Sequence, residues 1–209
     1  PVLLDADANF SWDIAGIEWR HKSNDPTHRD SFRAKIFTTS NPDAGIVRFV
    51  DSHSISASTA SNLVSADFDN DGFTDIITIK PLSSGASDKA CNWTLHRGGP
   101  ASEFRAVDNV GPPLPSELEG NPTIGDVDSD GDIDLLFVCA DSVELFINQG
   151  GNANNWIDIP IRAEDAKQAQ KPNERVNIHG VGSLLEIRSG QAYQPQVVTG
   201  RTTHFGLGK

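Results

Sequence analysis

Two short stretches of the chain place aspartates at the spacing that a divalent cation needs. Residues 67–75 read DFDNDGFTD and residues 126–134 read DVDSDGDID, so both follow the pattern DxDxDGxxD. Carboxylates at every second position of a tight turn can point to one centre, and Ca²⁺ takes six to eight oxygen ligands. Without a cation such crowded carboxylates repel one another. The spacing therefore predicts one calcium ion in each loop.

The role of each residue follows from its position in the loop. Positions one, three, five and nine offer carboxylates, and position seven offers a backbone carbonyl. Gly72 and Gly131 stand at the sharp turn, where a positive φ is expected. The predicted ligands are Asp67, Asp69, Asp71, Phe73 (through its carbonyl) and Asp75 in the first loop, and Asp126, Asp128, Asp130, Asp132 (through its carbonyl) and Asp134 in the second.

A third, weaker copy opens the chain. The stretch DADANFSWD places Asp5, Asp7, Asn9 and Asp13 at the offsets of the two full loops. Phe10 stands where the other loops have glycine, and a Cβ at that position strains the turn. We therefore expect weak calcium binding or none at this copy.

The loops are not of the EF-hand type. An EF-hand needs a bidentate glutamate at loop position twelve and a helix on each side, whereas position twelve here is Thr78 or Phe137. Each loop is followed by an apolar, β-branched run, 76–79 or 133–138, which is typical of a strand. The pattern thus predicts a strand–loop–strand hairpin.

The charge of the chain is concentrated in these loops. The chain has 29 acidic and 17 basic residues and a net charge of −12, and the aspartates of the three loops account for the whole excess. We interpret this charge as the chemistry of local sites and not as a general acidic surface. An acidic chain of this kind is not expected to bind nucleic acid.

The segments around the loops also repeat, and a repeat of this length is typical of propellers and solenoids. Each loop precedes several short strands: 91–97 and 104–108 follow the first full loop, and 135–139, 143–148 and 156–161 follow the second. In the opening copy we expect the strands 36–38 and 47–51. The predicted fold is all-β, with three four-stranded propeller blades at about 1–51, 52–110 and 111–162.

The repeats resemble a known family. The two loops and the segments LHRGGPASEF and LFINQGGNANNW are similar to FG-GAP or VCBS repeats, the blades of integrin-α-type propellers. The run NERVNIHGVGSLLEIRSG and the final HFGLG resemble the ASPIC/UnbV domain, which follows such repeats in cartilage acidic protein and in bacterial secreted proteins. The resemblance implies a truncated, β-rich ASPIC/UnbV-like segment at 163–209. Here His179 and Val181 depart from the family's small residues.

Partners and location follow as expectations. Three blades are fewer than a closed propeller needs and leave open sheet edges, so we expect either the rest of a larger parent chain or a protein assembly to cover them. No run of eighteen apolar residues predicts a membrane span. Weak extracellular-type calcium sites would stand empty in cytosol, which predicts a secreted, periplasmic or cell-surface protein.

The sequence carries no recognisable catalytic pattern, so we expect no enzyme activity. The six histidines lack HExxH spacing, and no GxSxG elbow or phosphate loop is present. Cys91 and Cys139 are interpreted as buried packing residues or as a disulfide. The leading hypothesis is a calcium-binding module for adhesion, scaffolding or assembly. The alternatives are an accessory subunit of an envelope or enzyme complex, or a secreted enzyme or glycan-binding protein.

Overall fold

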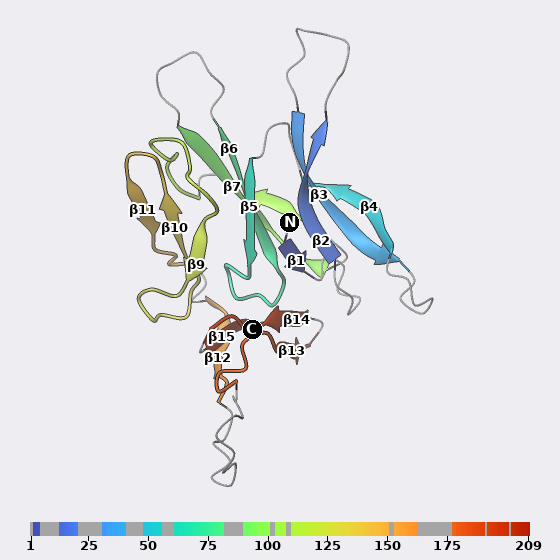
Figure 1. The fold of residues 1–209 in the computed structure, drawn as a ribbon. Helices are drawn as coiled ribbons and strands as arrows, with labels where there is room; N and C mark the ends of the chain where they lie inside the picture. The colour runs from blue at the N-terminus through green and yellow to red at the C-terminus, as the bar shows by residue number, and fades with distance from the viewer. Residues whose placement is uncertain are drawn as a thin grey trace, which may run out of the picture.

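The fold is built from strands, as the sequence predicts. The computed structural model (Figure 1) describes residues 2–4, 13–20, 31–40, 48–55, 61–81, 90–100, 103–107, 110–150, 153–162, 177–190, 192–200 and 202–209. Every regular element within these ranges is a β-strand or a short turn, and none is an α-helix. Over the same ranges no helix is found that could cross a lipid bilayer.

The first two sheets are four-stranded antiparallel meanders. Their strand orders, β1-β2-β3-β4 and β5-β6-β7-β8, follow the chain. The first sheet comprises β1 (Val2–Leu4), β2 (Asp13–Arg20), β3 (Ser31–Ser40) and β4 (Arg48–Ser54). The second comprises β5 (Asn62–Ala66), β6 (Asp75–Pro81), β7 (Cys91–Arg97) and β8 (Arg105–Val107).

The remaining described strands form three smaller sheets. The third sheet has the order β11-β10-β9, and the two-stranded sheets pair β12 with β15 and β13 with β14. The strands of the third sheet are β9 (Thr123–Gly125), β10 (Asp134–Val138) and β11 (Val143–Phe146). The C-terminal strands are β12 (Asn155–Pro160), β13 (Leu184–Ser189), β14 (Ala192–Val197) and β15 (Thr202–Gly208).

The second sheet is buried on both faces. Because neighbouring residues of a strand point to opposite faces, Ile76 packs in a cluster with Ala15 and Ile36 of the first sheet. Ile77 packs in another cluster with Phe137 of the third sheet. Ile76 and Ile77 of β6 thus pack against the two flanking sheets, which explains why neighbouring positions of this strand are both apolar.

The strands predicted at 36–38 and 47–51 are found as parts of β3 and β4, whereas β2, which directly follows the opening aspartates, was not predicted. One predicted strand assignment is wrong. Segment 156–161 was expected to be the outer strand of the third sheet, but β12 pairs with β15 instead. The side chain of Asn154 donates to the backbone of Asp69 at 2.7 Å, and this bond draws the chain away from the third sheet.

The two cysteines are free thiols, and both are buried. They belong to the same apolar cluster between the second and third sheets. This arrangement agrees with the packing interpretation of Cys91 and Cys139.

Candidate metal centre

Three hairpins of the chain share one register. The last residue of the first strand pairs with an aspartate that opens the second strand: Leu4 with Asp13, Ala66 with Asp75, and Gly125 with Asp134. The connecting segments therefore have equal length. Segments 67–74 and 126–133 are described, whereas segment 5–12, with the predicted ligands Asp5, Asp7 and Asn9, lies outside the described residues.

The aspartate that opens each second strand closes the hairpin onto the third strand. Asp13, Asp75 and Asp134 are almost completely buried. The Oδ1 atom of each accepts a hydrogen bond of 2.8 Å from a backbone N–H at or just beyond the end of the third strand, on Thr39, Gly98 and Asn148 respectively. A buried carboxylate needs such donors. Because this bond recurs in the first, second and third sheets, their hairpins resemble one another in structure as well as in aspartate spacing.

In the two full loops this aspartate also bonds the loop itself. Asp75 Oδ2 accepts from the N–H of Phe68 at 2.9 Å, and Asp134 Oδ2 accepts from the N–H of Val127 at 2.7 Å. Both oxygens of each carboxylate are thus bonded to backbone amides. Asp75 and Asp134 were predicted to be metal ligands, and here they lie beside the loop centre and fix its ends.

The first carboxylate of each loop organises the turn. Asp67 accepts from the N–H groups of Asp71 at 3.1 Å and Gly72 at 2.9 Å. Asp126 accepts in the same way from the N–H groups of Ser129 at 2.7 Å and Gly131 at 3.0 Å. These bonds curl the backbone around the carboxylate.

The curl needs two residues with positive φ in each loop. The values are +57° at Asn70, +96° at Gly72, +64° at Ser129 and +91° at Gly131. Glycine adopts this conformation freely, and asparagine tolerates it better than most residues. The predicted positive φ of Gly72 and Gly131 is confirmed.

Three carboxylates converge at the centre of each loop. One oxygen from each of Asp67, Asp69 and Asp71 lies within 4.8 Å of the others, and the same holds for Asp126, Asp128 and Asp130. Three hard oxygen donors in this arrangement can bind a divalent cation. These six residues are the predicted ligands at positions one, three and five. The chain could complete such a site with further carbonyl oxygens and water.

The two centres differ in exposure. Asp67 is buried and Asp69 and Asp71 are half-buried, whereas Asp128 is exposed. Burial raises the pKa of Asp67 from 3.8 to about 7, with a further contribution from the charge of Asp71. Burial also raises the pKa of Asp71 and of Asp75. Keeping the carboxylates of the first centre ionised therefore costs free energy, and a bound cation would remove this cost.

Arginine 97 supplies one positive charge to the first centre. Its guanidinium forms an ion pair with the carboxylate of Asp69, and its side chain is half exposed. Arg97 ends strand β7, whose neighbour Gly98 bonds Asp75. Nothing in the sequence spacing indicated this pair, because it joins positions far apart in the chain.

A second long-range residue joins the two loops. The Nδ2 group of Asn148 donates to the carbonyl of Phe68 at 2.6 Å and to that of Ile133 at 3.3 Å. Its backbone N–H bonds Asp134. One asparagine therefore ties the first loop to the second, and the sequence analysis missed it.

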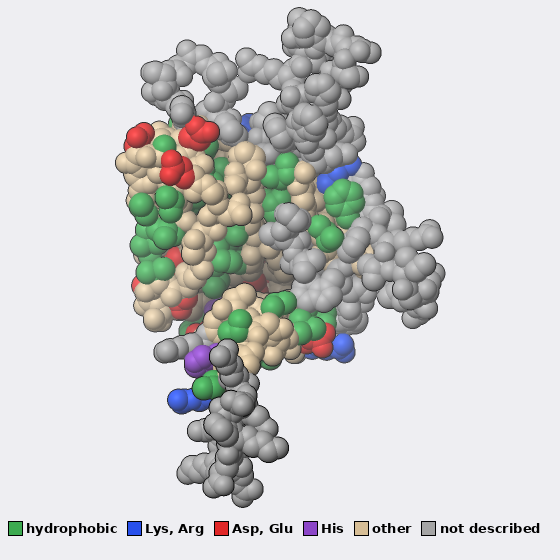
Figure 2. Space-filling model, viewed as in Figure 1, with side chains coloured by type: hydrophobic (Ala, Val, Ile, Leu, Met, Phe, Trp, Pro, Cys, Tyr) green, Lys and Arg blue, Asp and Glu red, His purple; other side chains and the backbone are tan. Residues whose placement is uncertain are grey.

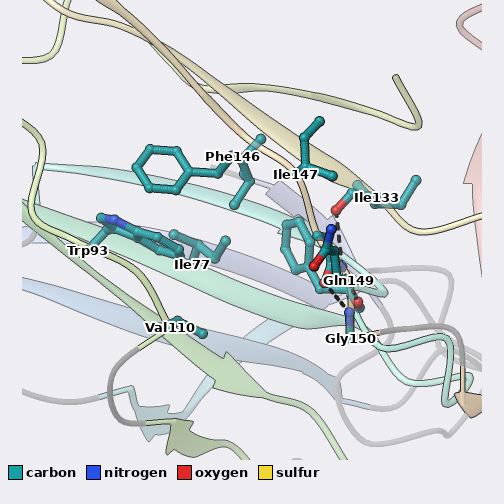
Figure 3. Close-up of a pocket in the computed structure, with 11 residues that line it drawn as sticks. Ile77, Trp93, Val110, Ile133, Phe146, Ile147, Gln149 and Gly150 are labelled. Atoms are coloured by element: carbon teal, nitrogen blue, oxygen red, sulfur yellow. Dashed lines mark hydrogen bonds between the residues drawn. The ribbon is translucent and has the colours of Figure 1, made fainter. Parts of the chain in front are cut away.

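The loop ends meet at an apolar cavity. A cavity of about 300 Å³ lies between the second and third sheets, and Figure 3 shows Ile77, Trp93 and Phe146 on its wall. Trp93 packs against Phe146 with ring centroids 5.3 Å apart, and its Nε1 donates to the carbonyl of Pro112 at 3.0 Å. The aromatic residues thus pack the two sheets together.

Phe73 and Asp132, whose backbone carbonyls were predicted to bind the metal, form hydrogen bonds within their loops. The N–H of Phe73 donates to Asp71 at 2.8 Å, and that of Asp132 donates to Asp130 at 3.0 Å. The side chain of Asp132 is buried and accepts from Asn70.

A search with protein-family models and a search of curated proteins returned no match.

The raised pKa of Asp67 predicts a pH dependence in calcium-free solution. The folded state holds this proton up to about pH 7 and the unfolded state only to about pH 4. Stability should therefore fall as pH rises from about 4 to about 7, by several degrees in melting temperature, and change little from this group above that range. Melting curves in excess chelator, compared with those of Asp67→Asn, measure this slope. Equal slopes in the wild type and the variant would contradict the assignment.

Proposed function

We propose that this chain is a non-catalytic calcium-binding module of a secreted or cell-surface protein, with a role in adhesion, scaffolding or assembly. The observation that carries the proposal is the convergence of three carboxylates in each of two loops with the same hairpin register. Calcium is the favoured cation because it accepts many oxygen ligands in flexible geometry. The two hairpin loops, which are closed by backbone hydrogen bonds to Asp75 and Asp134, provide such a geometry.

In this proposal calcium has a structural role. Each ion would neutralise carboxylates that otherwise repel one another, and it would fasten two strands of a sheet at their loop end. A ligand that binds only the folded state adds its binding free energy to stability. The repeated hairpins also support propeller blades of the FG-GAP or VCBS type.

The cavity between the second and third sheets gives less support to the carbohydrate-binding alternative. Its wall is largely apolar. The Nδ2 of its Asn148 donates to backbone carbonyls, and the Oδ1 accepts from Gly150 at 3.0 Å. Such a surface favours packing between sheets over the binding of sugar hydroxyls.

The calcium role predicts a shift in melting temperature. Several millimolar calcium should raise the melting temperature of the wild type by on the order of 5 °C per site relative to excess chelator. Asp69→Asn and Asp128→Asn should each remove about half of the shift, because each deprives one centre of a charge. Asp141→Asn, an exposed aspartate outside the loops, is the control and should keep the full shift. Superimposed wild-type curves with calcium and chelator would refute the calcium role.

The outer face of the third sheet supports a role in assembly. Paired residues of antiparallel strands share a face, so the pairs Leu136–Leu145 and Val138–Val143 lie together. Val138, Val143 and Leu145 are 40%, 62% and 47% exposed. Figure 2 shows hydrophobic side chains over this part of the molecule. A contiguous apolar face of this kind marks an interaction surface.

The occupant that we propose for this face is a β-sheet of a second copy of the chain. Within one chain, the second sheet already covers comparable apolar faces of the first and third sheets. The same packing between chains would continue that stack.

Assembly through this face predicts self-association. Sedimentation equilibrium of the wild type should give a mass above that of one chain at micromolar concentration. Leu145→Glu should restore the single-chain mass, because it buries a charge in the interface. Ile178→Glu replaces an equally exposed apolar residue elsewhere and should not change the association. A wild type of single-chain mass at all concentrations would refute this interface.

A further inference from the structure

One buried residue of the first loop connects three segments of the chain. Asn70 is fully buried, and its Nδ2 donates to the Gly131 carbonyl at 2.9 Å and to the Asp132 carboxylate at 3.2 Å in the second loop. Its Oδ1 lies 2.9 Å from Nε2 of His204 in β15. Its backbone carbonyl accepts from the N–H of Gly208 at 2.9 Å.

These bonds determine the orientation of the Asn70 amide. The carbonyl of Gly131 can only accept, so the amide nitrogen of Asn70 must face it. The amide oxygen then faces His204, whose Nε2 must be the donor. A side chain that could only donate or only accept would leave one of these neighbours unpaired, which is costly in a buried site.

Strand β15 lies directly on the first loop. A Cβ at Gly206 would collide with the carboxylate of Asp67 and the backbone of Asn70. Figure 1 shows the C-terminal strands at the end of the second and third sheets where the loops lie. The close approach therefore requires glycine at position 206, and it brings β15 against a candidate metal ligand.

The second loop is covered by the partner strand of β15. A Cβ at Gly131 would collide with the ring of Trp156 in β12. Trp156 in turn stacks on His204, with ring centroids 5.6 Å apart. Each strand of the β12–β15 sheet thus contacts one loop.

The β12–β15 sheet is itself braced. Nδ1 of His204 bonds Asp158 of β12 at 2.9 Å. Gln196 of β14 donates to the His204 carbonyl at 2.7 Å, and Ser189 of β13 donates to the Leu207 carbonyl at 2.8 Å. A displacement of β15 would break bonds in both C-terminal sheets.

The corresponding residue of the second loop has no such role. Ser129 stands at the same loop position and has a similar φ of +64°. Its side chain is exposed. The two positions share a backbone conformation and differ in burial, which makes them a matched pair for experiment.

We propose that Asn70 is a positioning residue that couples the two acidic loops to each other and to the β12–β15 sheet. Ordering of one loop fixes the donors and acceptors that the other loop and β15 need. Coupling between two sites is reciprocal, so each site should strengthen the other by the same factor. The metal-linked part of this inference rests on the proposed calcium function.

Calcium titration of four proteins tests the coupling: wild type, Asp128→Asn, Asn70→Gly and the double variant. Glycine keeps the positive φ and removes the side chain. In the wild-type background, Asp128→Asn should weaken calcium binding at the first loop about fivefold or more, a typical lower value for coupled sites. In the Asn70→Gly background the same change should have a clearly smaller effect on the first loop, because only the link through Asn148 remains. An equal effect of Asp128→Asn in both backgrounds, or no effect in the wild type, would overturn the coupling of the loops.

Hydrogen exchange without metal tests the structural part separately. Asn70→Gly should accelerate amide exchange in 155–160 and 202–208, and the control Ser129→Gly should not. Unchanged exchange in Asn70→Gly would overturn the coupling to β15. The absence of calcium binding in all four proteins would refute the calcium function and the metal-linked coupling, whereas the exchange result would still decide the role of Asn70.

Discussion

The structure depends on the crowding of carboxylates at the tips of two hairpins. Each loop brings three aspartate oxygens within 4.8 Å, and the first loop does so in a largely buried position. Like charges at this distance repel strongly in a partly buried site. Backbone N–H groups and Arg97 offset part of this repulsion in the first loop. A divalent cation would offset it more completely.

The loops that hold these crowded carboxylates belong to sheets that are packed firmly together. The first three sheets pack face to face through two apolar clusters, and the second sheet contributes to both. The buried aspartate that opens each second strand connects the loop to the third strand by backbone hydrogen bonds. Metal binding at a loop would therefore affect the whole sheet, because the carboxylate of Asp75 or Asp134 bonds both the loop and the end of the third strand.

Much of this arrangement could be predicted from the sequence because it is local. The aspartate spacing, the glycines at positive φ and the alternating apolar residues of 76–79 all express rules that operate over a few residues. The hairpins and their loops followed from these rules. The predicted convergence of Asp67, Asp69 and Asp71 is found in the structure, as is that of Asp126, Asp128 and Asp130.

The long-range features could not be predicted. Asn70, Asn148 and Arg97 act through partners far away in the chain, and no periodic pattern marks them. Strand β12 pairs with β15, which is distant in the sequence, and Trp156 and Gly206 of these strands lie against the loops. Asp75 and Asp134 have the spacing of ligands, and the spacing gave no sign that backbone amides would bond both of their oxygens.

An anomalous difference map from crystals grown in millimolar calcium would show whether the two acidic loops bind the ion. We expect one calcium peak in each full loop, at roughly 2.3–2.6 Å from oxygens of Asp67, Asp69 and Asp71 and of Asp126, Asp128 and Asp130. Loops that hold only water under those conditions would contradict this expectation.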